Sequence, residues 1–358
     1  MKVWAGSATV FGALALLVST ALAIQPDLPR IEKAVQKRVA KGQFMGAVLV
    51  ARSGRTILSK GYGKANLEWQ IPNSSHTRFR IGSVTKQFTA ASVLLLEERG
   101  KLKIADPISK YLPDAPPAWR PITFFNLLTH TSGIPDLTAF PDFDATEAYP
   151  TTPEKLVGRF RDKPLDFPPG TAFKYSNSGY ILLGYLIEKI TGQTYRQFVQ
   201  ENILGPLGMK SSGYDSNVEI VLQHAEGYAS GKSGLVVAGY VDMSIPFAAG
   251  GLYSTTEDLL RWEEGLYGGK LLSAASLTKM ITPFKEDYAF GVAVDLDARG
   301  NRVIWHRGAI EGFSASLIYV PAERLSVIVL SNIEGSAARD ISDAILEITD
   351  HEFNIPKH

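Results

Sequence analysis

The stretch Ile81-Gly82-Ser83-Val84-Thr85-Lys86-Gln87-Phe88 is the part of the chain around which the fold and its chemistry can be worked out. It opens an amphipathic run, so we expect a helix from about Ser83 to Glu98. Residues three apart share one helix face, which lets the Ser83 hydroxyl meet the Lys86 amine. Serine needs such a neighbour to act as a nucleophile at neutral pH. The free N–H groups and positive dipole of a helix N-terminus would also stabilise an oxyanion at Ser83.

The Ser-x-x-Lys motif has only two fixed letters. A second copy, Ser276-Leu277-Thr278-Lys279, occurs later in the chain, and a sequence of this size should contain roughly one by chance. The motif alone therefore leaves Ser83 and Ser276 as competing candidates.

The N-terminus has the pattern of a secretory signal peptide. Lys2 precedes the apolar run 10–18 and the small residues Ala21-Leu22-Ala23. That run is shorter than the roughly 20 apolar residues that a membrane-spanning helix needs. We expect residues 1–23 to be removed, which leaves a periplasmic or secreted protein with no stable membrane anchor.

Composition excludes several classes of partner. The 358 residues include 37 basic and 36 acidic side chains, and removal of Lys2 leaves 36 of each. Such a balanced charge gives no indication of nucleic acid or an anionic membrane as partner. The chain has no cysteine, so its stability must come from the core. The oligomeric state is not predictable from these features.

The order of the predicted elements indicates an α+β fold. We expect strands over residues 44–51, 56–62, 288–296, 302–305, 314–319 and 325–330, and helices over residues 28–41 and 337–348. These segments join most economically into one antiparallel sheet flanked by the N- and C-terminal helices. Residues 24–80 and 285–358 would form this sheet lobe.

Residues 81–284 predict a large, mainly helical insertion. Short helices are expected over residues 124–129, 153–160, 179–190, 195–203 and 256–266, separated by loops rich in proline and glycine and without strands of any length. Ser254 and Glu257 have the spacing of a capping box for the last helix. A pocket between the two lobes is the expected position of a site.

Tyr175 and Asn177 form a second motif, in a loop just before a predicted helix. Two residues apart on an irregular loop, they can point to the same side. Tyr175 would then carry a proton between the serine and a leaving group, and Asn177 would contact a substrate amide and hold Lys86. The alternative is a half-buried tyrosine beside an asparagine that caps the helix.

A third motif, Trp305-His306-Arg307-Gly308-Ala309, ends a strand expected at an edge. Gly308 would let a substrate backbone approach closely, and the Ala309 N–H would complete an oxyanion hole. Lys232-Ser233-Gly234 is a competing triad that we rank below His306. His130 has no second ligand at metal spacing, so we interpret it as structural, and we expect no metal or organic cofactor.

Together these residues resemble the serine β-lactamase and penicillin-binding-protein superfamily, in the branch that holds class C β-lactamases, D-amino-acid peptidases, DD-carboxypeptidases and related esterases. Its three motifs match in order Ser83-x-x-Lys86, Tyr175-x-Asn177 and His306-x-Gly308, and its framework signatures resemble residues 127–135, 205–209 and 250–254. The resemblance covers nearly all of residues 28–350, which implies one catalytic unit.

The resemblance implies acyl transfer through an ester on Ser83. Lys86 and Tyr175 would move protons, the N–H groups of Ser83 and Ala309 would bind the oxyanion, and water would release the acyl group. Whether Lys86 or Tyr175 is the base stays open. A basic lysine near neutral pH needs its pKa lowered by some three units, through burial or a positive neighbour.

Two residues depart from the most common pattern. His306 stands where class C β-lactamases carry lysine and the esterases carry tryptophan, and it is more similar to the DD-carboxypeptidase and D-aminopeptidase members. Arg307 replaces a small residue, and it either binds a substrate carboxylate or faces solvent. The absence of a Ser-Asp-Asn motif argues against class A, and the absence of a G-x-S-x-G motif argues against an α/β-hydrolase.

The sequence therefore favours a secreted serine hydrolase with D-amino-acid peptidase or DD-carboxypeptidase activity on a peptide or small-molecule substrate. A carboxylesterase or weak β-lactamase on the same site is an alternative. A non-catalytic penicillin-binding protein is another.

Overall fold

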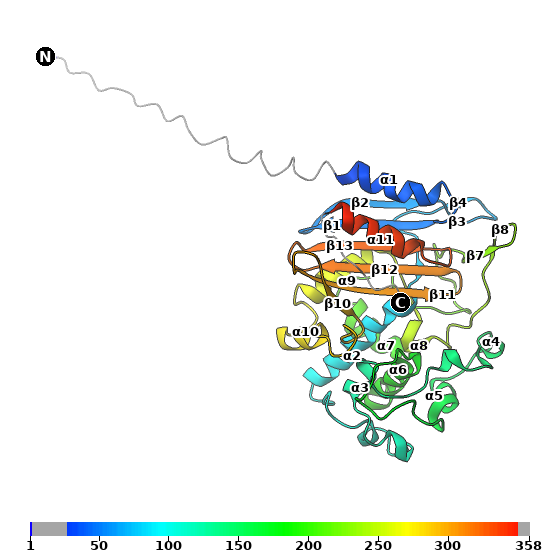
Figure 1. Ribbon diagram of the computed structural model, residues 1–358, viewed down its shortest axis with the longest axis vertical. Helices are drawn as coiled ribbons and strands as arrows, with labels where there is room; N and C mark the ends of the chain where they lie inside the picture. The colour runs from blue at the N-terminus through cyan, green and yellow to red at the C-terminus, as the bar shows by residue number, and fades with distance from the viewer. Residues whose placement is uncertain (2–26, 350–358) are drawn as a thin grey trace.

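The computed structural model describes Met1 and residues 27–349, so the predicted signal peptide lies outside the described residues apart from Met1. Its main element is a six-stranded antiparallel sheet with the strand order β10-β11-β12-β13-β1-β2 (Figure 1). These strands are β1 (Gly46–Arg52), β2 (Arg55–Tyr62), β10 (Ala293–Leu296), β11 (Arg302–Ile310), β12 (Phe313–Val320) and β13 (Leu325–Ser331). The α+β sheet expected from the sequence is confirmed.

The two ends of the chain meet in the middle of this sheet. β1 pairs with β13, with Val48 opposite Val329 and Leu49 opposite Ile328. Both strands are apolar along most of their length because both faces of the sheet are covered, one by each layer of helices.

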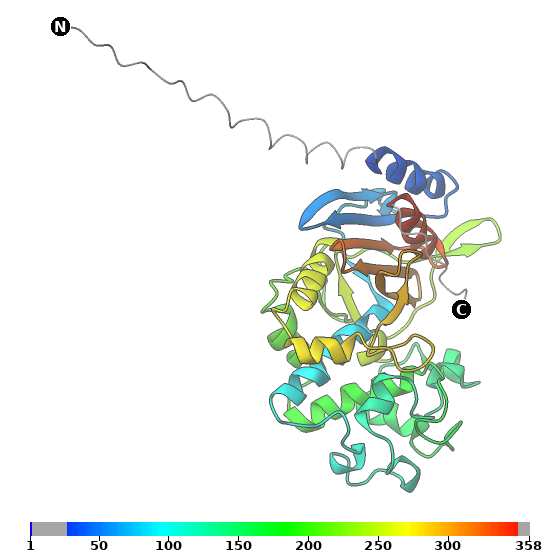
Figure 2. The ribbon, with the colours of Figure 1, turned by 60° about the vertical axis from the view of Figure 1, so that its left-hand side comes forward.

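Two helices cover one face. α1 (Asp27–Val39) and α11 (Ala337–Ile348) lie side by side on it, at opposite ends of the colour scale in Figures 1 and 2. Ile31 and Val35 from α1 and Ile341 and Ile345 from α11 join one apolar cluster with the sheet. The expectation of terminal helices that flank the sheet is therefore confirmed.

The helical lobe covers the opposite face. Its central helix, α2 (Thr85–Glu98), is buried from Thr85 to Leu96, as expected for a helix surrounded by others. Trp262 of α9 (Thr256–Tyr267) stacks on Phe88 of α2 with ring centroids 4.0 Å apart. The other helices of this lobe are α3 (Phe124–Leu128), α4 (Phe143–Thr146), α5 (Pro153–Arg161), α6 (Asn177–Thr191), α7 (Tyr195–Val199), α8 (Phe247–Gly250) and α10 (Ala274–Met280).

The expectation that this lobe contains no strands is wrong. β9 (Leu252–Ser254) pairs with both β5 (Phe79–Arg80) and β6 (Gly213–Tyr214), and β7 (Tyr228–Gly231) pairs with β8 (Gly234–Val237). β3 (Lys64–Asn66) and β4 (Ile71–Pro72) form a further small pair. Strands of two to four residues are too short to show an alternating pattern, so no periodicity predicts them.

Other boundaries also differ from the expected ones. The N-cap of α9 is Thr255, whose hydroxyl accepts a hydrogen bond from Asp258 N at 3.1 Å, so the predicted capping box at Ser254 and Glu257 is off by one residue. β11 continues five residues beyond the predicted end, to Ile310. This extension becomes one wall of the site.

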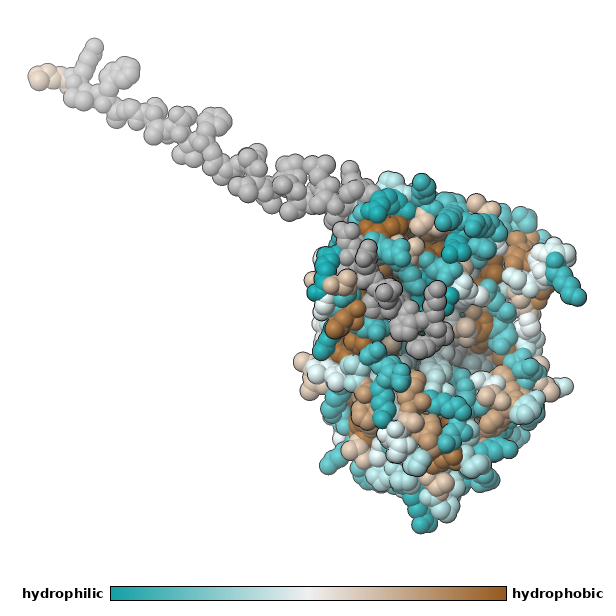
Figure 3. All heavy atoms as spheres, viewed as in Figure 1, coloured by the Kyte–Doolittle hydropathy of each residue, from teal (hydrophilic) through white to brown (hydrophobic). Residues whose placement is uncertain are grey.

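The surface in Figure 3 is mostly hydrophilic on the face shown, with hydrophobic side chains scattered between. None of the helices in the described ranges combines the length and apolarity that a bilayer crossing requires.

Candidate active site

Ser83 lies in a 3₁₀ turn, Gly82–Val84, directly before α2. Gly82 has a φ of +49°, and a Cβ there would lie 2.9 Å from the backbone nitrogen of Ala309. A Cβ on Gly308 would collide with the carbonyl oxygen of Ile81. Because neither residue has a side chain, the serine turn and strand β11 come into backbone contact, which places Ser83 and Ala309 side by side.

The edge of β11 is open at this point. β10 pairs with β11 only from Arg302 to Trp305. From His306 to Ile310 the strand borders the serine turn instead of another strand. The third motif thus lies at a sheet edge as the sequence predicted.

Lys86 is completely buried and lies against Ser83. Its Nζ donates hydrogen bonds to Ser83 Oγ at 3.0 Å, to Asn177 Oδ1 at 2.8 Å and to the Ala249 carbonyl at 2.9 Å. Burial lowers the pKa of Lys86 to about 7, against the opposing charge of Asp136. A large part of Lys86 is therefore neutral near pH 7. The neutral amine has two N–H groups, which suffice for Asn177 and Ala249, and its lone pair can then accept the proton of Ser83 Oγ.

Tyr175 covers the amine from the other side. Its ring centroid is 4.8 Å from Lys86 Nζ. Burial raises the pKa of Tyr175, and its hydrogen bond with Ser83 opposes that shift. The phenol keeps its proton at neutral pH, so this environment suits a proton donor better than a phenolate base.

Asn177 is oriented by a residue that the sequence did not indicate. Asp136 Oδ1 accepts a hydrogen bond from Asn177 N at 3.1 Å, and Asp136 Oδ2 accepts one from Asn177 Nδ2 at 3.3 Å. The amide oxygen is thereby turned toward Lys86. Asn177 is the first residue of α6 and Ser176 is the N-cap, so Asn177 does not cap the helix.

His130 lies behind Tyr175 and makes structural contacts, in agreement with its interpretation as a structural residue. Its Nδ1 accepts a hydrogen bond from Ser176 N at 3.1 Å and its carbonyl accepts one from Lys174 N at 3.0 Å. The ring centroids of His130 and Tyr175 are 4.3 Å apart. His130 therefore holds the loop that carries Tyr175, which only the tertiary contacts reveal.

His306 is buried beside the site. Its Nδ1 lies 2.6 Å from the Arg307 carbonyl, so it must donate there, which leaves Nε2 to accept from the Tyr288 hydroxyl at 3.0 Å. Burial, with the nearby charge of Lys86, lowers the pKa of His306 to about 3. His306 is neutral and brings no positive charge to the site.

Arg307 is partly buried and does not simply face solvent. Its guanidinium lies 4.7 Å from the centre of a Trp305 ring and 3.3 Å from Asp343 on α11. It also lines the larger of two pockets at the site.

Two pockets meet at Ser83 and Ala309. The larger pocket has a volume of about 710 Å³ and is lined on one side by Tyr175, His306 and Arg307. The smaller pocket has a volume of about 270 Å³, and Asn177 is part of its lining. The serine thus lies at the junction of two differently sized spaces.

The competing motifs lie elsewhere. Ser276 and Lys279 belong to α10, and neither lines the two pockets. Lys232 and Ser233 form the turn between β7 and β8. Within the described ranges no group of three His, Cys, Asp or Glu side chains is placed to hold a metal ion.

The chain is similar to known proteins over most of its length. A family model described as Beta-lactamase matches residues 31–349. The putative penicillin-binding protein PbpX of Bacillus subtilis is 32% identical over 295 residues, which are 82% of this chain and 72% of that protein.

Two solved structures are similar across their whole length. A penicillin binding protein from Bacillus halodurans has 30% identity and a TM-score of 0.79, over 88% of this chain and 99% of that one. A D-stereospecific amidohydrolase from a Streptomyces species has 26% identity and a TM-score of 0.76, over 89% and 98%.

Proposed function

Because the chain belongs to the β-lactamase family, we propose that it is a serine hydrolase that cleaves an amide or peptide bond through an acyl-enzyme on Ser83. The observation that carries this proposal is the buried Lys86 amine, which is hydrogen-bonded to Ser83 Oγ and only to uncharged acceptors. A serine with an adjacent neutral amine is an activated nucleophile.

Lys86 is the acylation base in this proposal. The bond between Ser83 Oγ and the carbonyl carbon forms as the serine proton moves to Lys86 Nζ. The carbon–nitrogen bond breaks as Tyr175 gives its proton to the leaving nitrogen, and Lys86 restores the proton of Tyr175. Water then adds to the ester, the same groups move its proton, and Ser83 is released with the acid product.

The oxyanion would be bound by the N–H groups of Ser83 and Ala309. Gly82 lies against the backbone of Ala309, and Gly308 lies against the backbone of Ile81. These contacts support the proposal, because they bring the two N–H groups to one place without intervening side chains. A donor of this kind contributes roughly 10²- to 10³-fold to kcat.

We favour a D-amino-acid amide or D-peptide as substrate. The similarity to a D-stereospecific amidohydrolase supports this class, as does histidine at position 306. Action in the periplasm or outside the cell, as the N-terminal pattern predicts, would place the enzyme near such peptides.

Intact-protein mass spectrometry tests the proposal. Wild type, Ser83→Ala and Ser276→Ala are each exposed to a fluorophosphonate and, separately, to a penicillin. We expect one fluorophosphonate adduct on wild type and Ser276→Ala, and none on Ser83→Ala. An adduct that persists in Ser83→Ala, or a wild type that no reagent labels, would contradict it.

Rates on three substrate classes then rank the activities. We expect hydrolysis of D-alanyl amides and peptides to exceed that of nitrocefin and p-nitrophenyl esters, each compared as kcat/KM. Faster ester or nitrocefin hydrolysis would favour the esterase or β-lactamase alternative on the same serine.

A further inference from the structure

The two pockets at Ser83 receive different parts of a substrate. This step rests on the proposed function. Tyr175, the proton donor to the leaving group, lines the larger pocket and not the smaller one. Asn177 lines the smaller pocket and not the larger one. With the carbonyl oxygen between the N–H groups of Ser83 and Ala309, the leaving group extends into the larger pocket and the acyl part into the smaller one.

The smaller pocket is sized for a single residue. Its volume of about 270 Å³ is just below the range of about 300–1,000 Å³ that is usual for small-molecule sites. Several of its walls are apolar: Leu137, Phe143, Ile181, Val241, Ile245 and Pro246. An acyl group of one amino acid fits this space.

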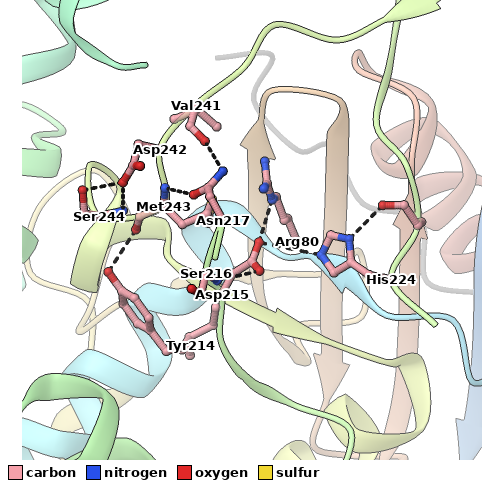
Figure 4. A network of polar contacts seen from close by, with 12 residues as sticks. Arg80, Tyr214, Asp215, Ser216, Asn217, His224, Val241, Asp242, Met243 and Ser244 are labelled. Atoms are coloured by element: carbon pink, nitrogen blue, oxygen red, sulfur yellow. Dashed lines mark hydrogen bonds and ion pairs between the residues drawn. The ribbon is translucent and has the colours of Figure 1, made fainter. Parts of the chain in front are cut away.

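Hydrogen bonds hold the far wall of the smaller pocket in place. In Figure 4, Asn217 Nδ2 donates to the Val241 carbonyl at 3.0 Å, and Asn217 Oδ1 accepts from Met243 N at 2.6 Å. The Tyr214 hydroxyl donates to the Met243 carbonyl at 2.9 Å. Asp242 N donates to the Glu147 carbonyl at 2.9 Å. The wall and the backbone of Glu147 therefore form one connected unit beside Ser83.

Two carboxylates face this apolar space. Glu147 and Glu311 both line the smaller pocket. Burial raises the pKa of both, and the charge of Glu311 adds to the shift at Glu147. Over residues 27–349 no ion pair neutralises either carboxylate. Arg80, the cation that acts on Glu311, is already bound to Asp215 at 2.7 Å (Figure 4).

We propose that Glu147 and Glu311 bind a free ammonium group on the acyl part of the substrate. The enzyme would then act on amino-acid amides or on peptides with a free amino terminus, and discriminate against N-acylated ones. A cation supplies the countercharge that the two carboxylates lack, and an added N-acyl group would remove that charge and enlarge the group that the pocket must hold.

Two covalent probes test this proposal on the acyl side alone. Diphenyl 1-aminoethylphosphonate and its N-acetyl derivative both form a bond between Ser83 Oγ and phosphorus and release phenol, and they differ only at the nitrogen. The rate of each reaction is followed by intact mass. We expect wild type to react more than tenfold faster with the free amine. Glu147→Gln and Glu311→Gln keep the side-chain size and should each reduce that ratio about tenfold.

Glu226→Gln is the matched control. Glu226 is exposed and lines neither pocket, and its neighbour Gly227 packs against Gly312, next to Glu311. Removing its charge should leave the ratio at the wild-type value. A fluorophosphonate without an amine should label all four proteins at similar rates, which shows that each site is intact.

The outcomes separate the two proposals. An unchanged ratio in both pocket variants overturns the role of the glutamates. If neither aminoethylphosphonate reacts while the fluorophosphonate labels Ser83, the pocket does not accept an aminoacyl group. That result also overturns the role of the glutamates. If the fluorophosphonate also fails on wild type, the serine mechanism itself is wrong, and the pocket assignment fails with it.

Discussion

The two Ser-x-x-Lys segments have the same spacing but very different surroundings. Lys86 is 0% exposed and donates to Ser83 and two further uncharged acceptors. The side chain of Lys279 is 50% exposed and pairs with Glu97 at 2.7 Å. Lys86 is shielded from water and has no carboxylate bound to it. Lys279 is in contact with water and is paired with a carboxylate.

The difference teaches that the spacing supplies only proximity. A carboxylate partner or contact with water stabilises the charged form of an amine, and a dry pocket with neutral acceptors favours the form that can accept a proton. The neutral acceptors around Lys86 come from residues distant in sequence, such as Asn177 and Ala249.

Replacing each lysine by methionine is the strongest test of this comparison. Lys86→Met should lower kcat/KM by at least about 10³-fold, because the serine loses its base. Lys279→Met should stay within about twofold of wild type. Steady-state rates on the best D-alanyl amide measure both, and equal losses in the two variants would contradict the comparison.

Burial of Lys86 should also appear in stability. Its pKa in the folded protein, about 7, lies below the ordinary value of 10.5 for a lysine, so the unfolded chain binds more protons between these pH values. The free energy of unfolding should therefore rise as pH increases from about 7 to 10.5, by up to a few kcal/mol. Lys86→Met should lose this rise.

Urea denaturation at pH 7 and pH 10 measures this contribution. The comparison uses the difference between wild type and Lys86→Met at each pH, so that other titrating groups cancel. Lys279→Met serves as the control and should keep the wild-type rise. A pH-independent difference between wild type and Lys86→Met would mean that the amine is not desolvated.

Asp136 gives a smaller and more selective effect. Asp136→Asn removes the charge that raises the pKa of Lys86. The acidic limb of the pH profile of kcat/KM, which should lie near pH 7 in wild type, should therefore move to lower pH. We also expect about a tenfold loss at the optimum, since Asn177 is less firmly oriented. A limb that stays in place would show that Lys86 is not the titrating base.

The smallest expected effect concerns the ion pair of the second motif. Lys279→Met should lower the free energy of unfolding by less than about 1 kcal/mol, because an exposed pair contributes little. The change should shrink further in high salt, where surface charges are screened. A loss of several kcal/mol would mean that α10 depends on this pair.

The sequence predicted those parts of the molecule that follow from local pattern. The main strands and the terminal helices show clear periodicity, and the motif residues Ser83, Lys86, Tyr175 and Asn177 converge in the structure as expected from their order. The contacts of Asp136 and His130 could not be predicted, because each of these residues accepts a hydrogen bond from a loop about 40 residues further along the chain. No local signal marks such a pairing.

The two carboxylates of the smaller pocket were missed for the same reason. Glu147 follows α4 in the helical lobe and Glu311 follows β11 in the sheet, and nothing in either segment points to the other. The short strands and the cap at Thr255 were missed because they depend on one or two hydrogen bonds.

The pairing of Val48 with Val329 also governs how the protein can fold. Nearly the whole chain must be present before β1 finds its partner β13, so the central contacts of the sheet are among the most distant in sequence. Such contacts form slowly, and the hairpin of β1 and β2 keeps an open apolar edge until they do. A chain interrupted before Leu325 would be an aggregation hazard and not a smaller version of the folded protein.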